Sequence, residues 1–418
     1  MRFFLGAFGE PGHAFPMLAL GARLAERGHE VTFETWSRWR EHVEAAGMRF
    51  EPAPEYPLFP RPGEPFKMYE IVVPATRHTR RTVAELRPDV VVHDILTLAP
   101  ALAGELEGVP VATLVPHVHP AGADAFPPYA LGARLPRTWV GRGVWRRAER
   151  WTQAGLRQGR AELNDARRDV GLPPVSHLHG GLSERLCLVG TFPQLEYPRQ
   201  WSAGTHVVGP IMWEPPFGSV SAPPGDAPLV LVAPSTAQDP EHRLLRAALA
   251  GLGDEPVRVL ATWNRRPLPA DRPVAVPDNT RLVEWISYSQ TMPSCSAVIC
   301  HAGHGTMVRA LASGCPVVAV PHCGDMAENA ARADWAGAGV RLPWRFLTPG
   351  TLRLAVRRAL SEASLRARAG ELAAWAATHD GASRAADLVE ELGSPAGAQA
   401  RAHVSPGAGA STAGTGAT

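Results

Sequence analysis

The sequence has almost no lysine, little net charge and no long apolar run. Lys67 is the only lysine among 418 residues, and the formal net charge is +2. This balance gives no overall field that would attract nucleic acid or an acidic membrane surface. No stretch of about 18 apolar residues is present to span a bilayer, and residues 1–8 continue into a motif and not into a signal-peptide cleavage site. We therefore expect a soluble cytoplasmic protein that binds neither nucleic acid nor membranes.

Cysteine is also scarce, and no two cysteines form a CxxC pair. The cysteines, which lie mostly in apolar runs, are Cys187, Cys295, Cys300, Cys315 and Cys323. An odd, scattered set is typical of reduced core thiols in a cytosolic protein. A zinc site built from Cys300, His301, His304 and Cys323 is an alternative, but the ligand spacing typical of structural zinc is missing. We expect no metal and no cofactor.

The chain does contain a regular alternation of short apolar runs and helical patterns. Helical patterns cover 17–27, an arginine-rich stretch at 142–168, and 352–392. The apolar runs that predict strands are 2–7, 31–34, 90–92, 111–115, 186–189 and 207–208 in the first half, and 229–233, 257–262, 281–284, 297–300, 317–320 and 340–342 in the second. This alternation favours an α/β fold with parallel sheets covered on both faces.

A segment rich in Pro, Gly and Ser interrupts the alternation and predicts an interdomain linker. Two Rossmann-like domains joined in this way have parallel sheets that face each other across a cleft, where ligands tend to bind. The last residues are small and polar, which predicts a disordered tail. The predicted units are an N-terminal domain (1–208), the linker (209–228), a C-terminal domain (229–381), a helix packing back on the first domain (382–393) and the tail (394–418).

The most informative motif is Cys-His-Ala-Gly-His-Gly-Thr at 300–306. The apolar run that ends there predicts a buried strand, and the residues from Gly305 onward predict a helix. Backbone N–H groups at a helix start lack internal partners and carry partial positive charge, so a phosphate fits there. Gly303 and Gly305 allow close approach to the main chain, while His301 and Thr306 can add side-chain donors. We interpret the motif as a site for a diphosphate, which is the leaving group of a nucleotide-activated sugar.

A second candidate, His13, follows the first predicted strand at its carboxyl end. Neutral imidazole titrates near physiological pH and can take a proton from a hydroxyl. The apolar run 90–92 leads to Asp94 at another carboxyl edge, and this carboxylate would fix the tautomer of His13 and stabilise its imidazolium. The alternative is that each residue only caps the helix that follows it. Asp89 is a weaker partner because it starts the strand.

Taken together, these motifs resemble those of family 1 glycosyltransferases of the GT-B fold, specifically the actinobacterial enzymes that decorate small-molecule natural products. The N-terminal motif from Gly9 to Pro16, with His13 as its base, and the strand ending in Asp94 match that family. The segments that match its donor-binding signature in order and spacing are Val283-Glu-Trp285, His301-Ala-Gly303-His-Gly305-Thr306, Gly314-Cys-Pro316-Val and Pro321-His-Cys-Gly-Asp325. The resemblance covers about residues 1–393.

The resemblance implies a role for each matched residue. His13 would be the general base, and Asp94 would orient it. Trp285 would stack on the nucleobase, Ser235 would contact a phosphate, and Asp325 would bind sugar hydroxyls. The donor-binding residues implied in this way are Ser235, Thr236, Trp285, His301, Gly303, Gly305, Thr306, Asp325, Glu328 and Asn329.

Three positions depart from the family's pattern. Ile-Ser-Tyr at 286–288 stands where many relatives have Pro-Gln, and Arg309 replaces the acid that many of them use on ribose. The choice between uridine and thymidine donors therefore stays open. Met326 replaces the usual Gln, so one contact to a sugar hydroxyl is lost. This favours a deoxyhexose because an unpaired polar group is costly, although Glu328 and Asn329 could compensate.

The implied reaction is inverting transfer of a hexose from a UDP- or dTDP-sugar, the co-substrate, to a hydroxyl of a small hydrophobic acceptor. Segments 53–66 and 116–138 are rich in Pro, Gly and aromatics and predict loops over the carboxyl ends of the sheet, and residues 53–80 and 116–150 would line the acceptor pocket. The candidate acceptor-binding residues are Phe15, Phe59, Phe66, Tyr69, His117 and Phe126. Two alternatives stay open: a GT-B nucleotide-sugar epimerase that needs no acceptor, and a non-catalytic sugar-nucleotide binder. The sequence does not distinguish a monomer from a homodimer.

Overall fold

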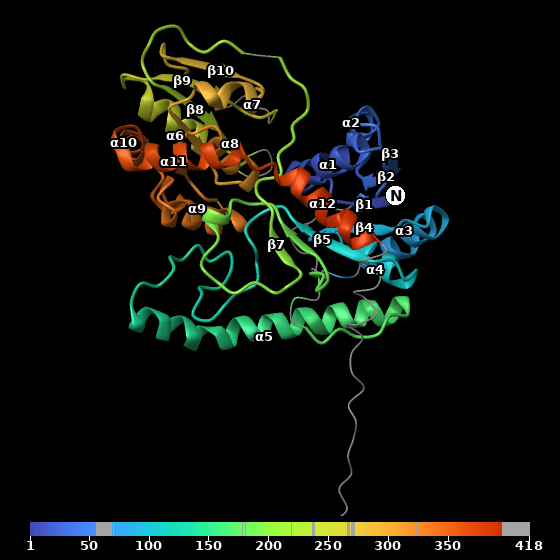
Figure 1. Ribbon diagram of the computed structural model, residues 1–418. Helices are drawn as coiled ribbons and strands as arrows, with labels where there is room; N and C mark the ends of the chain where they lie inside the picture. The colour runs from blue at the N-terminus through green and yellow to red at the C-terminus, as the bar shows by residue number, and fades with distance from the viewer. Residues whose placement is uncertain are drawn as a thin grey trace, which may run out of the picture.

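Two parallel sheets organise the chain in the computed structural model (Figure 1). The residues described by the structure are 1–55, 69, 71–177, 179, 181–218, 220–235, 239–265, 268, 272–322 and 324–394. Among these residues, no helix is both long and apolar enough to cross a bilayer. The prediction of an α/β fold built on parallel sheets is confirmed.

The first sheet has the strand order β3-β2-β1-β4-β5-β6-β7, and every neighbouring pair is parallel. Its strands are β1 (Arg2–Gly6), β2 (Glu30–Thr35), β3 (Arg49–Pro52), β4 (Val90–Asp94), β5 (Val111–Val115), β6 (Cys187–Val189) and β7 (Thr205–Val207). β4 and β5 are buried along their whole length because helices cover both faces of the sheet. Parallel strands place their carboxyl ends at one edge, so the ends of β1 and β4 lie side by side there.

The second sheet has the order β10-β9-β8-β11-β12-β13 and is also parallel. Its strands are β8 (Leu229–Ala233), β9 (Arg258–Thr262), β10 (Thr280–Val283), β11 (Ala297–Cys300), β12 (Val317–Ala319) and β13 (Gly339–Arg341). β8 and β11 are adjacent at the centre and fully buried. The carboxyl ends of these two strands therefore lie next to each other.

Helices cover the faces of both sheets. They are α1 (Pro11–Glu26), α2 (Arg40–Ala45), α3 (Val72–Leu86), α4 (Leu98–Leu106), α5 (Trp139–Val170), α6 (Arg243–Leu252), α7 (Tyr288–Thr291), α8 (His304–Ala312), α9 (Asp325–Trp335), α10 (Pro349–Ser361), α11 (Ala363–Ala376) and α12 (Gly381–Gly393). We call the part from β1 to β7 the first lobe and the part from β8 to α11 the second lobe. Figure 1 shows the two lobes side by side, with α5 running below.

The last helix, α12, belongs by packing to the first lobe. Its residues Ala385 and Val389 are buried in the same apolar cluster as Leu18 and Leu24 of α1. Ion pairs reinforce this contact, since Arg27 lies 2.9 Å from both Asp387 and Glu390. The exact limits of the predicted domains stay a prediction.

Three local details of the structure differ from the sequence analysis. The first helix begins at Pro11 and not at residue 17, because Pro11 occupies the first helical position, where its fixed φ fits, and the helix continues through Pro16. The four-residue strand β3 was not predicted because only Phe50 in it is buried. The helical pattern over 352–392 is divided into α10, α11 and α12.

Candidate active site

The carboxyl edge of the first sheet brings His13 and Asp94 together. His13 lies in the first turn of α1, directly after β1, and Asp94 is the last residue of the adjacent strand β4. The Nδ1 atom of His13 lies 2.7 Å from Oδ1 of Asp94. The other carboxylate oxygen of Asp94 accepts from the backbone N–H of Phe8 at 3.3 Å and from Thr97 Oγ1 at 3.5 Å. With Nδ1–H donating to Asp94, the lone pair is on Nε2 of His13.

The charges around His13 raise its pKa above the ordinary 6.5. Burial, the largest single cause, lowers this pKa, but the charge and hydrogen bond of Asp94 and the smaller effects of the charges of Asp325 and Glu10 together outweigh it. The side chain of His13 is 18% exposed, whereas that of Asp94 is 1% exposed. Because Asp325 belongs to α9, a charge of the second lobe acts on His13 of the first lobe.

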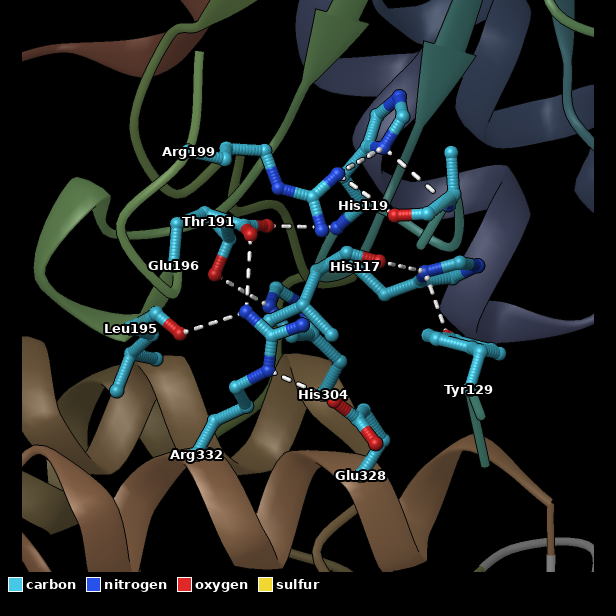
Figure 2. Close-up of polar contacts among 12 residues, drawn as sticks. His117, His119, Tyr129, Thr191, Leu195, Glu196, Arg199, His304, Glu328 and Arg332 are labelled. Atoms are coloured by element: carbon cyan, nitrogen blue, oxygen red, sulfur yellow. Dashed lines mark hydrogen bonds and ion pairs between the residues drawn. The ribbon is translucent and has the colours of Figure 1, made fainter. Parts of the chain in front are cut away.

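His117 lies beside His13 on the loop that follows β5. The centroids of their rings are 6.5 Å apart. His117 Nδ1 is 2.8 Å from the carbonyl oxygen of Val118 and 3.1 Å from the hydroxyl of Tyr129 (Figure 2). Burial lowers the pKa of His117, so its imidazole is neutral and can hydrogen bond to a polar group near His13. Tyr129 is a site neighbour that the sequence analysis did not include among its candidates.

The remaining candidate acceptor-binding residues are dispersed. Phe15 packs between Trp39 and Trp213, with ring centroids 5.0 Å from each. Tyr69 packs onto the apolar cluster that includes Leu98. The guanidinium carbon of Arg199 lies 4.9 Å from the ring centroid of Phe126, while Phe59 and Phe66 lie outside the described residues. The structure therefore brings only His117 of this set next to His13, and the acceptor roles stay a prediction.

The predicted diphosphate motif forms a strand-to-helix turn at the carboxyl end of β11. Gly303 caps α8, and the residue before it, Ala302, has φ +60°. A non-glycine residue in this left-handed region stores strain, of the kind that clusters at ligand sites. A Cβ atom added at Gly303 or Gly305 would meet no neighbouring atom within 4 Å among the described residues. The first turn of α8 is therefore approachable, and its orphan N–H groups suit an anion.

His301 is predicted to contact a diphosphate directly, but in the structure its ring is buried and contacts other parts of the protein. It is 1% exposed, its Nδ1 accepts from the backbone N–H of Ser235 at 2.9 Å, and its Nε2 lies 3.3 Å from Oδ2 of Asp239. Both ring nitrogens thus face the segment that follows β8. In this position His301 can orient the backbone at Ser235, while Thr236 lies outside the described residues. A direct role of His301 on phosphate stays a prediction.

Helix α9 carries the predicted sugar-binding residues at its start. Asn329 Nδ2 donates to Oδ2 of Asp325 and to the carbonyl oxygen of Ala302, both at 3.0 Å. This contact ties α9 to the turn that leads into α8. Oε2 of Glu328 and Oδ1 of Asn329 are buried and have no hydrogen-bond partner within the part of the chain that the structure describes. The start of α9 therefore holds two buried acceptors that no described residue satisfies.

The residues that depart from the family pattern contact one residue of the predicted linker, Glu214. Its carboxylate accepts from Ser287 Oγ at 2.6 Å and from the backbone N–H of Tyr288 at 3.2 Å, and it lies 3.8 Å from Nε of Arg309. The turn after Trp285 is therefore fixed from the linker. One face of the Trp285 ring is occupied, since the guanidinium carbon of Arg265 lies 5.0 Å from its centroid.

No group of three or more His, Cys, Asp or Glu side chains among the described residues is arranged to hold a metal. Burial raises the pKa of Cys300 to about 12, so this residue is a neutral thiol in the structure as described. Cys323, the other thiol of the alternative zinc set, lies outside the described residues.

Glu34 is a buried carboxyl group that the sequence analysis did not single out. It is 1% exposed at the carboxyl end of β2, and Thr79 Oγ1 lies 2.8 and 3.0 Å from its two oxygens. With Phe8, Trp36 and Thr97 it lines a cavity of about 20 Å³, enough for about one water molecule. Burial raises its pKa from 4.5 to about 8, an effect that the Thr79 hydrogen bond reduces. The sequence could have indicated Glu34 as a candidate by its position at the end of a predicted strand.

This group should make stability fall with rising pH. Between about 4.5 and 8 the unfolded state has released the Glu34 proton while the folded state retains it, so the free energy of unfolding decreases as pH rises through that window. Because Gln does not titrate, we expect Glu34→Gln to reduce this pH-dependent decrease in the free energy of unfolding by on the order of a few kcal/mol. Denaturant unfolding at pH 5 and pH 8 measures it, with exposed Glu41→Gln as the control. An equal pH dependence in wild type and Glu34→Gln would contradict the assignment.

Comparison with known proteins identifies the class. Residues 247–392 match the C-terminal domain of erythromycin biosynthesis protein CIII-like proteins. The chain is 30% identical to 4'-demethylrebeccamycin synthase of Lentzea aerocolonigenes, covering 91% of this chain and 97% of that protein. It is 28% identical to O-mycaminosyltylonolide 6-deoxyallosyltransferase of Streptomyces fradiae, covering 94% and 97%.

Solved structures agree. A calicheamicin glycosyltransferase superimposes with a TM-score of 0.74 at 25% identity, covering 95% of this chain and 99% of the other. A spinosyn rhamnosyltransferase solved with thymidine diphosphate gives 0.66 at 19% identity, covering 94% and 100%. The chain thus belongs to the GT-B glycosyltransferases of antibiotic biosynthesis. The resemblance stated from the motifs, the fold and the glycosyltransferase class are confirmed.

Proposed function

We propose that the protein is an inverting glycosyltransferase that moves a hexose from a UDP- or dTDP-sugar to a hydroxyl of a small hydrophobic natural-product acceptor, with His13 as the general base. The observation that carries the proposal is the 2.7 Å contact between Nδ1 of His13 and Oδ1 of Asp94. It leaves Nε2 as the basic atom, and the charge of Asp325 on the second lobe acts on the same imidazole.

In the proposed reaction, Nε2 of His13 takes the proton of the acceptor hydroxyl as the acceptor oxygen attacks the anomeric carbon. The new bond forms on the face opposite the leaving group, which inverts the configuration. The bond from the anomeric carbon to the diphosphate oxygen breaks, and its electron pair leaves with the diphosphate. Asp94 stabilises the imidazolium that forms, while the sugar develops oxocarbenium character.

The start of α8 is suited to stabilise the departing diphosphate. Its N–H groups and its dipole favour negative charge, and the space above Gly303 and Gly305 is open. Charge stabilisation by fixed dipoles of this kind acts on the transition state without a metal ion. Thr306, in the first turn of α8, adds a hydroxyl donor.

We expect His301→Ala to weaken binding of UDP and dTDP about tenfold or more, because the N–H of Ser235 loses its acceptor and the segment after β8 loses its anchor. Isothermal titration with each nucleotide measures the dissociation constant. His379→Ala, an exposed histidine between α11 and α12, is the matched control. Unchanged affinity in His301→Ala would remove His301 from the donor site.

A donor and acceptor panel tests the function itself. UDP-hexoses and dTDP-hexoses, including dTDP-6-deoxyhexoses, are incubated with aromatic and macrocyclic aglycones, with and without EDTA. The deoxy sugars are included because relatives named as deoxyallosyl- and rhamnosyltransferases are similar to this chain. We expect a glycoside with inverted anomeric configuration and equal yield in EDTA. Epimerised donor formed without acceptor, or a retained configuration, would contradict the proposal.

A further inference from the structure

A buried arginine connects the two lobes beside the candidate active site. Arg332 of α9 is 2% exposed, and its Nη1 donates to Oε2 of Glu196 at 2.9 Å and to the carbonyl oxygen of Leu195 at 3.3 Å (Figure 2). Glu196 and Leu195 lie between β6 and β7 of the first lobe. The guanidinium carbon also lies 3.7 Å from the ring centroid of Tyr197. An ion pair, a carbonyl contact and a cation–π contact thus meet at one cation.

Glu196 connects this cation to the loop that carries His117. Its second oxygen, Oε1, accepts from the backbone N–H of His119 at 2.6 Å. His119 is two residues from His117, whose ring neighbours His13. Glu196 is 6% exposed, so water does not compete for either contact. One carboxylate therefore joins the His117 loop to helix α9.

On α9, Arg332 also fixes Glu328. Its Nε donates to Oε1 of Glu328 at 2.8 Å, which leaves Oε2 of Glu328 as a buried acceptor without a partner in the described chain. Asp325 lies one turn before Glu328 on the same helix. The guanidinium thus sets the position of a helix whose first turns hold the candidate sugar-binding groups.

Stability is a weak reason for such a pair. Removing two charges from water costs several kcal/mol per ion in practice, and well-packed apolar residues often replace a buried pair without loss. An exposed pair also joins distant parts of the chain: Arg23 of α1, 43% exposed, lies 3.0 Å from Asp380, 46% exposed, which caps α12. Exposed pairs contribute little to stability. The buried pair differs from the exposed one because the surrounding side chains hold its geometry, so it can position the segments that it joins.

From this geometry we infer that Glu196 and Arg332 are positioning residues, which hold the start of α9 at a fixed place relative to His13. The inference rests on the proposed function, because it assigns sugar binding to that start of α9. Neither residue touches the reacting atoms. Their effect is to align Asp325 and Glu328 with the base, and misalignment of about 1 Å can cost on the order of a hundredfold in rate.

Glu196→Gln is the sharpest test. The amide oxygen can still accept from His119, while the amide NH₂ turned toward Arg332 loses the attraction. We expect kcat for glycosyl transfer to fall about tenfold or more, with the dissociation constants of UDP and dTDP unchanged because they depend on α8. Hydrogen exchange should quicken both in α9 and in residues 116–130. Arg23→Ala, which removes the exposed pair, should change none of these readouts.

The outcomes separate the possible failures. A lowered Tm with unchanged kcat and unchanged exchange in the two segments means a merely structural pair and overturns the inference. Equal effects of Arg23→Ala and Glu196→Gln overturn it as well. Absence of transfer by the wild-type enzyme overturns the proposed function instead, and the exchange measurement then still decides whether the pair couples the two segments. If Glu196→Gln does not fold, Glu196→Gln/Arg332→Met carries the same test, since Glu328 can then take up a proton.

Discussion

Replacing His13 by alanine should reduce glycosyl transfer about 10²- to 10⁴-fold, the usual contribution of a positioned general base. The acceptor hydroxyl would then have to lose its proton to water during attack. Binding of UDP and dTDP should survive, because His13 lies on α1 of the first lobe and the proposed diphosphate site lies at the start of α8. Initial rates with the best donor and acceptor pair, with nucleotide titrations, measure both effects.

The control for this variant is His379→Ala, an exposed histidine between α11 and α12. It should retain wild-type turnover. Near-normal turnover in His13→Ala would reject the base role, whereas loss of both turnover and nucleotide binding would indicate a misfolded protein. Circular dichroism of each variant separates that case.

The sequence predicted the frame of the site because local patterns determine it. Apolar runs followed by helical patterns require parallel strands, and parallel strands place residues such as Asp94 at one edge. The turn at Gly303 was predicted for the same reason, since a buried strand leads directly into a helix. What it misjudged was the start of α1, where Pro16 resembled a boundary although Pro11 occupies the first position.

Contacts between distant residues could not be predicted in this way. Glu196 and Arg332 are separated by 136 positions, and Glu214 and Ser287 by 73. A charged residue carries no signal of its partner, and most are solvated. His301 is a further example. Its motif is local and was found in the sequence, but its ring contacts Ser235 and Asp239, which only the fold brings close.

The residues that depart from the family pattern lie close together in the fold and share one contact. Ser287 and Tyr288 stand at one departure and Arg309 at another, and all three contact Glu214 of the linker. A cation in place of the acid near the ribose position is thus matched by a carboxylate from elsewhere in the chain. Burial lowers the pKa of Arg309, an effect that the charge of Glu214 opposes.

Replacing Asp94 by asparagine should lower kcat about 10²- to 10⁴-fold without changing the packing around β4, because the amide NH₂ would donate to Nδ1 of His13 and place the ring proton on Nε2, the atom that must act as base. It should also move the pH profile. The base must be neutral, so kcat/KM falls as pH drops through the pKa of His13. In the wild type that pKa is raised above 6.5 by Asp94 against the effect of burial.

Without the carboxylate, burial is opposed only by the smaller contributions of Asp325 and Glu10. The midpoint of the acidic limb should therefore move to lower pH in Asp94→Asn, even as the plateau rate falls. Asp89→Asn is the matched control: Asp89 precedes the same strand, where its carboxylate accepts from the backbone N–H of Arg2 at 2.7 Å. A midpoint that stays in place or moves to higher pH in Asp94→Asn would show that the limb reports another group, since removal of a neighbouring carboxylate cannot raise the pKa of an imidazole.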